Sequence, residues 1–171
     1  MIDEIANELI VTSKILGTNN VSEIGRQIGY RPVMIINALY RGSESGKFVW
    51  NKKKDIIKIA EDVEVNSLSV SEGMSDLLEQ IEVLTGYLNT EEKDMSYDEL
   101  EMLFAGVPQL HLKIAVWSSK KLTTYDIAQP GDKDSVYTFV TMKENAEKQF
   151  GQKQFNAKKS KASQIKKPKA E

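Results

Sequence analysis

Side chains that bind phosphate and nucleic-acid bases are concentrated in one stretch of the chain. Residues 26–60 contain eight lysines and arginines against two acids, and three of the lysines are consecutive at positions 52–54. Such cations neutralise phosphates. Arginine also forms paired hydrogen bonds with guanine, and asparagine with adenine. Because the same stretch contains Arg31 and Asn37, its residue types favour binding of a nucleic acid.

Acidic charge follows directly in residues 61–102, which contain thirteen acids and one lysine. Residues 143–171 are basic again, with nine lysines against three glutamates. The formal net charge of −2 conceals this segregation. This segregation of charge indicates which partners each stretch can bind, because the acidic stretch repels phosphate and is better suited to a protein partner. The lysine-rich end suits a second nucleic-acid arm, solvation, or a contact with the acidic stretch.

Residue types for catalysis and metal binding are sparse. The chain has no cysteine and one histidine, His111, so we find no disulfide, no thiolate and no zinc-ligand spacing. No glycine-rich phosphate loop is present. We therefore expect a non-enzymatic protein without a cofactor or metal. For Trp50 and Trp117, at matching helix-to-strand junctions, core packing is expected, with base stacking as the alternative.

No apolar run is long enough for a membrane span, and the N-terminus has no pattern typical of a secretory signal. The absence of cysteine is typical of an intracellular setting. We expect a cytoplasmic protein, associated with DNA or the nucleoid, that has no membrane partner.

Three helices and a hairpin are predicted to position the basic residues. Apolar spacing predicts a helix over residues 2–17 with Glu8 on its polar face, then a short helix over residues 23–28 that Ser22 caps. A third helix is predicted over residues 32–42, where a proline begins it and a glycine ends it.

The buried stripe of the third helix is predicted to consist of Ile35, Ile36 and Leu39. After this helix the period changes. Aromatic and β-branched runs on either side of the lysine-rich turn predict two strands within residues 47–59.

The same order of elements is predicted a second time. Apolar spacing indicates an amphipathic helix over residues 73–90. A capping-box pattern, Ser-x-x-Glu, opens the next helix at Ser96, and Pro108 begins a third. Residues 122–128 and 135–141 are predicted strands around a Pro-Gly turn.

This order of elements resembles the winged-helix superfamily, in which a helix-turn-helix is followed by a β-hairpin wing. The first copy lies in residues 21–29, 30–32, 33–42 and 48–59, and the second in residues 95–106, 107–118 and 122–141. The resemblance implies an α+β fold, mainly α, with tandem winged helix-turn-helix units. The domains expected are 1–62 (basic unit 1), 63–72 (linker), 73–142 (unit 2, with acidic helices) and 143–171 (a flexible lysine-rich tail).

In winged-helix proteins the third helix of a unit enters the major groove. The resemblance therefore implies a DNA-binding surface on the outward side of the third helix and on the wing. Its candidate residues are Arg26, Arg31, Met34, Asn37, Ala38, Arg41, Lys47, Lys52, Lys53 and Lys54. A thinner second DNA surface would consist of Gln109, His111, Lys113, Lys120 and Lys121.

The sequence thus favours a DNA-binding regulator of transcription, of the small kind found in phages and plasmids. Unit 1 would read double-stranded DNA, and unit 2 would dock a protein partner or a second protomer. Two alternatives stay open. One is an inhibitor or adaptor of a polymerase, nuclease or other host machine that uses the acidic surface without reading DNA. The other is a replication or segregation factor in which both units contact DNA.

Overall fold

Helices predominate in the computed structural model, which describes residues 1–150, and two small antiparallel sheets accompany them. The predicted α+β class, mainly α, is confirmed. Contacts within the chain define two compact units. Unit 1 comprises residues 1–77 and 113–120, and unit 2 comprises residues 78–112 and, within the described part, 121–150. None of the described helices is long and apolar enough to cross a lipid bilayer.

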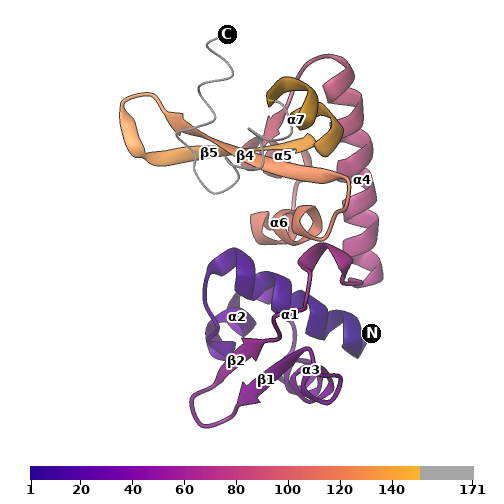
Figure 1. Cartoon of the computed structure of the whole chain (residues 1–171), viewed down its shortest axis with the longest axis vertical. Helices are drawn as coiled ribbons and strands as arrows, with labels where there is room; N and C mark the ends of the chain where they lie inside the picture. The colour runs from indigo at the N-terminus through magenta and orange to yellow at the C-terminus, as the bar shows by residue number, and fades with distance from the viewer. Residues whose placement is uncertain (151–171) are drawn as a thin grey trace. The chain divides into compact units, whose positions relative to one another are not determined.

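Unit 1 follows the predicted order of three helices and a hairpin (Figure 1). The hairpin is antiparallel, with Trp50 opposite Ile57. Its lysine-rich turn lies beyond the strands, at the end of the hairpin. The elements are α1 (Ile2–Leu16), α2 (Val21–Ile28), α3 (Pro32–Glu44), β1 (Phe48–Asn51), β2 (Ile56–Ile59) and the short 3-10 helix η1 (Val65–Ser67).

Helix α1 is buried over its whole central part, from Ile5 to Ser13. The prediction that Glu8 lies on a polar face is therefore wrong, since this residue is 1% exposed. Its carboxylate accepts hydrogen bonds from the Tyr30 hydroxyl at 2.5 Å and the Ser71 amide at 2.7 Å. These bonds stabilise an otherwise costly buried acid. They also connect α1 to two segments distant in sequence.

Asn20, not Ser22, caps helix α2. The Asn20 side chain accepts a hydrogen bond from the Glu23 amide at 2.9 Å, and α2 begins at Val21. The Ser22 hydroxyl instead donates to the Asp55 carboxylate in the hairpin turn. Asn20 has a second role, because it also forms a β-bridge with Ile56. The start of α2 is therefore fixed to the second strand of the hairpin.

The buried side of α3 differs from the predicted stripe. Its buried residues are Ile35, Ala38, Leu39 and Gly42, whereas Ile36 is 46% exposed. This spacing includes two small residues, and small residues permit close packing of a helix. A Cβ atom at Gly42 would lie 2.3 Å from the Phe48 ring, which explains the glycine. Gly42 also does not end the helix, which continues for two more residues.

Unit 2 also follows the predicted order of elements. The capping box is confirmed, because the Ser96 side chain and the Glu99 amide are bonded, and so are the Glu99 side chain and the Ser96 amide. The sheet order is β3-β5-β4. The elements are α4 (Glu72–Thr90, whose first residues belong to unit 1), β3 (Met95–Ser96), α5 (Tyr97–Leu103), α6 (Gln109–Trp117, whose residues from 113 onward belong to unit 1), β4 (Leu122–Gln129), β5 (Asp132–Met142) and α7 (Lys143–Phe150).

Helix α7 occupies the first residues of the predicted lysine-rich tail. Ala146 of this helix is fully buried against Tyr125, Ile127 and Phe139 of the sheet, so the ordered fold extends beyond the predicted end of unit 2. The Tyr125 ring stacks on that of Phe139 at 5.5 Å, and its hydroxyl donates to Asp94. Burial, reinforced by the Asp94 carboxylate, raises the pKa of Tyr125 well above its usual range. The rest of the predicted tail, residues 151–171, lies outside the described residues.

The two units share one detail of connectivity. In unit 1 the residue that caps the second helix, Asn20, pairs with the second strand of the hairpin at Ile56. In unit 2 the corresponding cap, Ser96, pairs with Phe139 in the second strand of its hairpin. In each unit the chain therefore passes from the first helix along the hairpin's second strand into the second helix.

Candidate nucleic-acid interface

Four cations of the first predicted DNA surface, in unit 1, are exposed and unpaired within residues 1–150. Their side chains make no hydrogen bond or ion pair with the described part of the chain. Arg26 lies in the last turn of α2 and Arg31 is the N-cap residue of α3, while Lys53 and Lys54 lie in the hairpin turn. These side chains are available for phosphate, which each can bind without first breaking an internal contact.

The hairpin turn is held in place from several sides. The Asn51 side chain accepts a hydrogen bond from the Lys54 amide at 3.1 Å, and the carbonyl of Asp55 accepts one from the Val21 amide at 2.8 Å. Asp55 adopts a left-handed conformation with φ 54°. The Ser22 hydroxyl binds its carboxylate. These contacts therefore hold the lysine-rich turn in a defined conformation and attach it to the start of α2.

Lys52 connects the turn to helix α3. Its ammonium group donates to the Tyr40 hydroxyl at 2.8 Å and lies 4.5 Å from the Tyr40 ring centroid and 5.5 Å from that of Trp50. The two rings meet edge to face at 5.3 Å. Cation–π attraction thus adds to a hydrogen bond. This cluster of Tyr40, Trp50 and Lys52 fixes the basic turn beside the exposed side of α3.

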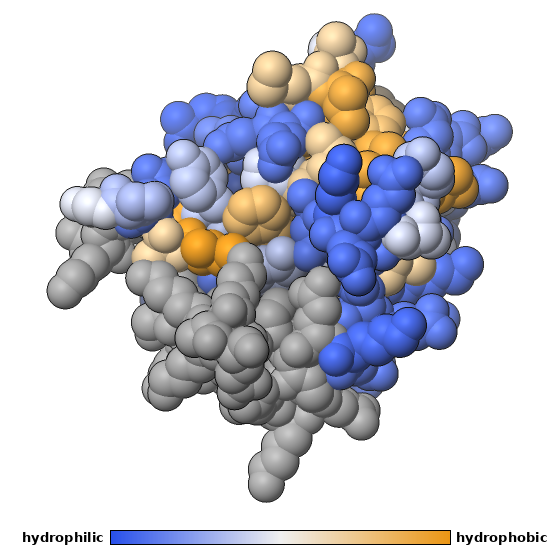
Figure 2. Space-filling model, turned by 90° about the horizontal axis from the view of Figure 1, so that it is seen from above, coloured by the Kyte–Doolittle hydropathy of each residue, from blue (hydrophilic) through white to orange (hydrophobic). Residues whose placement is uncertain are grey.

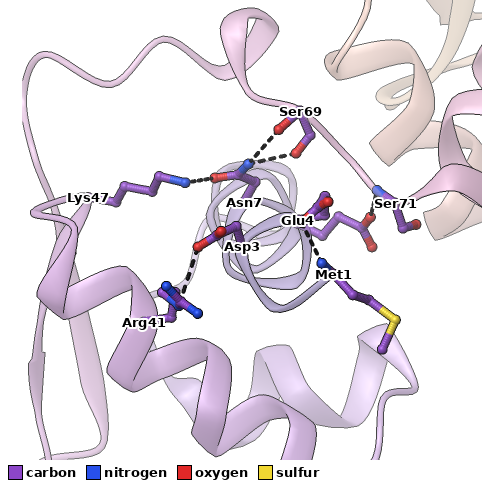
Figure 3. A network of polar contacts seen from close by, with 9 residues as sticks. Met1, Asp3, Glu4, Asn7, Arg41, Lys47, Ser69 and Ser71 are labelled. Carbon is purple, nitrogen blue, oxygen red and sulfur yellow. Dashed lines mark hydrogen bonds and ion pairs between the residues drawn. The ribbon is translucent and has the colours of Figure 1, made fainter.

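Two predicted contact residues have internal partners (Figure 3). The Lys47 ammonium donates to the Asn7 side chain at 2.6 Å, and the amide of Asn7 donates in turn to the Ser69 carbonyl at 2.6 Å. Lys47 is therefore part of the framework of unit 1. Arg41 lies 3.6 Å from Asp3, with both side chains about half exposed at 55% and 54%. An exposed pair of this kind is weak, so Arg41 can still exchange Asp3 for another anion.

The exposed side of α3 differs in composition from the prediction. Ala38 is fully buried, so its expected outward orientation is wrong, and Met34 is half-buried. Asn37 is exposed as predicted. Sequence reasoning missed three exposed apolar or aromatic residues, Val33 at 60%, Ile36 at 46% and Tyr40 at 46%. Local apolar spacing carries no signal for them, because the close approach of Phe48 to Gly42 selects the packed side.

The predicted second DNA surface is not assembled in the same way. The Gln109 amide donates to Asp98 at 2.9 Å and lies 3.4 Å from a Glu101 oxygen. His111 and Lys113 are half-buried, whereas Lys120 and Lys121 are exposed. Trp117 is 41% exposed, so its expected place in a core is wrong. A phosphate approaching the start of α6 would meet carboxylates at Gln109.

Unit 2 exposes apolar side chains among its acids. Figure 2 shows apolar side chains at the surface between hydrophilic ones. The most exposed apolar residues of unit 2 lie on α4 and α5, and their exposed fractions run from 60% to 82%. They are Val83, Tyr87, Met102 and Leu103. A surface that combines exposed apolar residues with acids suits a protein partner better than a nucleic acid, because acids repel phosphate.

Among the residues whose side chains the structure describes, no group of three or more histidine, aspartate or glutamate residues is placed to hold a metal ion. Comparison of the chain with protein-family models, with curated proteins and with solved structures found no match. Its own geometry is therefore the basis for assigning a function.

Proposed function

We propose that the chain is a non-enzymatic DNA-binding regulator, with two winged-helix units, that binds double-stranded DNA through α3 and the β1–β2 turn. One observation carries the proposal. The cluster of Tyr40, Trp50 and Lys52 fixes a turn of three lysines beside the exposed side of a helix that follows a helix-turn-helix connection. A helix in the major groove with a basic hairpin beside it is a known mode of DNA binding.

The shared connectivity of the two units supports the winged-helix interpretation. Each unit has three helices followed by a hairpin, and each has a capping residue that pairs with the hairpin's second strand. Two such units in one chain agree better with a repeated architecture than with two unrelated arrangements. Fold alone does not decide function, so the proposal rests on the surface of unit 1.

The surface of unit 1 has the charge that DNA binding requires. Arg26, Arg31, Lys53 and Lys54 are free, and Lys52 is exposed above its aromatic partners. The N-terminus of α3 has no side-chain cap, so the positive end of its helix dipole also favours a phosphate. With about five phosphates neutralised, affinity should fall several hundredfold between low and moderate salt.

The test is fluorescence anisotropy with a duplex of about two helical turns, measured at low and moderate salt. Lys53→Gln/Lys54→Gln should lower affinity about tenfold or more and flatten the salt dependence. The matched control is Lys14→Gln/Lys58→Gln, which removes the same charge from exposed lysines of α1 and β2. Equal losses of affinity in the two double variants would show that the effect depends on net charge and not on the position of the lysines. Absence of duplex binding at low salt would refute the proposal.

A second candidate function is favoured by the exposed apolar residues of unit 2. We propose that Val83, Tyr87, Met102 and Leu103, with the neighbouring acids, bind a protein partner or a second protomer. If unit 1 binds no duplex, an adaptor or inhibitor role based on this surface becomes the leading function. Sedimentation of the chain alone tests self-association. Met102→Ser/Leu103→Ser should shift any dimer toward the monomer.

A further inference from the structure

We infer that α3 selects A·T base pairs from the major groove, with Asn37 binding adenine and with Val33 and Ile36 contacting thymine methyl groups. The inference rests on the proposed DNA binding of unit 1. It concerns which duplexes this surface prefers, a property that the basic residues alone do not provide, because phosphate contacts carry no sequence information.

The three residues lie on the same exposed side of α3. Asn37 follows Val33 by four residues and Ile36 by one, and residues four apart lie one turn apart on a helix surface. Val33 is 60% exposed and Ile36 is 46% exposed. The Asn37 side chain is exposed and makes no hydrogen bond with any part of the chain that the structure describes. Its amide is therefore free to bind a partner.

The chemistry of the surface matches the major-groove edge of an A·T pair. Adenine presents an acceptor, N7, beside a donor, the N6 amino group, and an asparagine amide offers one donor and one acceptor. Thymine presents a C5 methyl group, which an apolar side chain contacts favourably. Valine and isoleucine methyl groups next to an asparagine amide thus suit both bases of the pair.

The same surface suits a G·C pair poorly. Guanine presents two acceptors, O6 and N7, which an arginine or lysine fork satisfies, whereas the amide oxygen of Asn37 would face an acceptor. Cytosine has no methyl group and presents a polar amino group to Val33 and Ile36. Arg41 follows Asn37 by four residues but is paired with Asp3 at 3.6 Å, and Arg31 precedes the helix as its N-cap residue.

The apolar exposure itself needs an explanation. Single exposed apolar residues are common on protein surfaces. Here Val33, Ile36 and Tyr40 follow one another at helical spacing on one side of α3, and exposed cations lie before them at Arg31 and beside them in the hairpin turn. A partner that binds these cations must be negatively charged, and it must also offer apolar groups to the exposed side of α3. The thymine methyl groups of duplex DNA meet that requirement.

Four duplexes of about two helical turns test the inference. Their alternating base pairs are A·T, A·U, G·C and I·C, where I is inosine. Uracil lacks only the thymine methyl group. An I·C pair lacks the guanine amino group, so it resembles A·T in the minor groove and G·C in the major groove. We expect binding to A·T to exceed binding to A·U by roughly tenfold, and I·C to behave like G·C, with weaker binding still.

Substitutions in α3 test whether this helix is the source of the preference for A·T pairs. Val33→Ala/Ile36→Ala should reduce the A·T over A·U ratio to about one, and Asn37→Ala should remove most of the A·T over G·C preference. The control is Val49→Ala, at an exposed valine (69%) on β1, which should leave both ratios unchanged. All these positions are exposed, so the variants should fold.

Each other outcome of the duplex-binding experiment contradicts a specific part of the inference or of the proposed function. If I·C binds like A·T, the preference comes from the minor groove and the inference is wrong. If all four duplexes bind equally, unit 1 binds DNA without base selection, and the inference fails while the proposed function stands. If no duplex binds at low salt, the proposed function fails as well.

Discussion

Units 1 and 2 each have three helices followed by a hairpin, but they differ in how they present the third helix. In unit 1, α3 is exposed along one side, and free cations lie next to it. In α6 most residues are buried or half-buried, and the polar residue at its start, Gln109, is bonded to Asp98. A repeated arrangement of elements therefore does not imply a repeated surface.

The physical source of this difference lies in side-chain size and charge. Small residues at Ala38 and Gly42 give α3 a narrow packed side, so its opposite side remains outside the core. Helix α6 has larger apolar residues at Leu112, Ile114 and Val116, all of them buried. The acids of unit 2 then add repulsion for phosphate.

The largest effect should come from Gly42→Ala. Its new Cβ would lie 2.3 Å from the Phe48 ring, so the helix or the ring must shift, at a cost of about 3 kcal/mol in the free energy of unfolding. The same change in unit 2, Gly86→Ala, meets open space within helix α4 and should stabilise the chain by about 0.5–1 kcal/mol. Urea unfolding followed by circular dichroism measures both. Equal effects at the two positions would show that α3 is not closely packed.

The next largest effect should come from Glu8→Ala. The substitution leaves the Tyr30 hydroxyl and the Ser71 amide without their shared partner, and it should lower the free energy of unfolding by about 2 kcal/mol. An exposed acid of unit 2, Glu79, provides the control, because Glu79→Ala should change stability by about 0.5 kcal/mol or less. Similar values for the two would place Glu8 at the surface, where the sequence pattern put it.

Glu8 and Ile36 show where sequence reasoning succeeds and where it stops. Apolar spacing and turn chemistry were enough to predict the order of elements and the Ser96 capping box, because these depend on neighbouring residues. Burial of Glu8 depends on Tyr30 and Ser71, which lie 22 and 63 residues away. No local pattern contains that information.

The same limit applies to the candidate interface. The cations of the hairpin turn and Asn37 could be predicted as exposed from charge and helical spacing. The orientation of α3 could not, because Ile36 and Ala38 differ little in what they contribute to an apolar pattern. Only the close approach of Phe48 to Gly42 selects the packed side. The internal bond of Lys47 to Asn7 likewise needs the tertiary fold.

A smaller effect is expected from alkaline pH. Burial, together with the hydrogen bond to Glu8 and its charge, raises the pKa of Tyr30 to about 12. Because the folded-state pKa lies above the unfolded value, the contribution of Tyr30 is complete below about pH 10 and is lost as the pH rises toward 12. With allowance for its partial exposure, the loss should be about 1 kcal/mol. The free energy of unfolding, measured against pH, should fall less steeply over this window in Tyr30→Phe than in the parent chain. An equal slope in the two proteins would argue against a raised pKa of Tyr30.

Effects of similar or smaller size are expected at the caps of the two second helices. Asn20→Ala and Ser96→Ala each remove a side-chain acceptor from a helix N-terminus and should each cost about 1 kcal/mol in the free energy of unfolding. Because both residues also pair through their backbones with the second strand of a hairpin, alanine keeps that pairing and isolates the cap. Ser22→Ala, at the residue that the sequence pattern favoured as cap, should cost less, since it removes only the exposed bond to Asp55. A larger loss for Ser22→Ala than for Asn20→Ala would move the start of α2, and with it the correspondence between the two units.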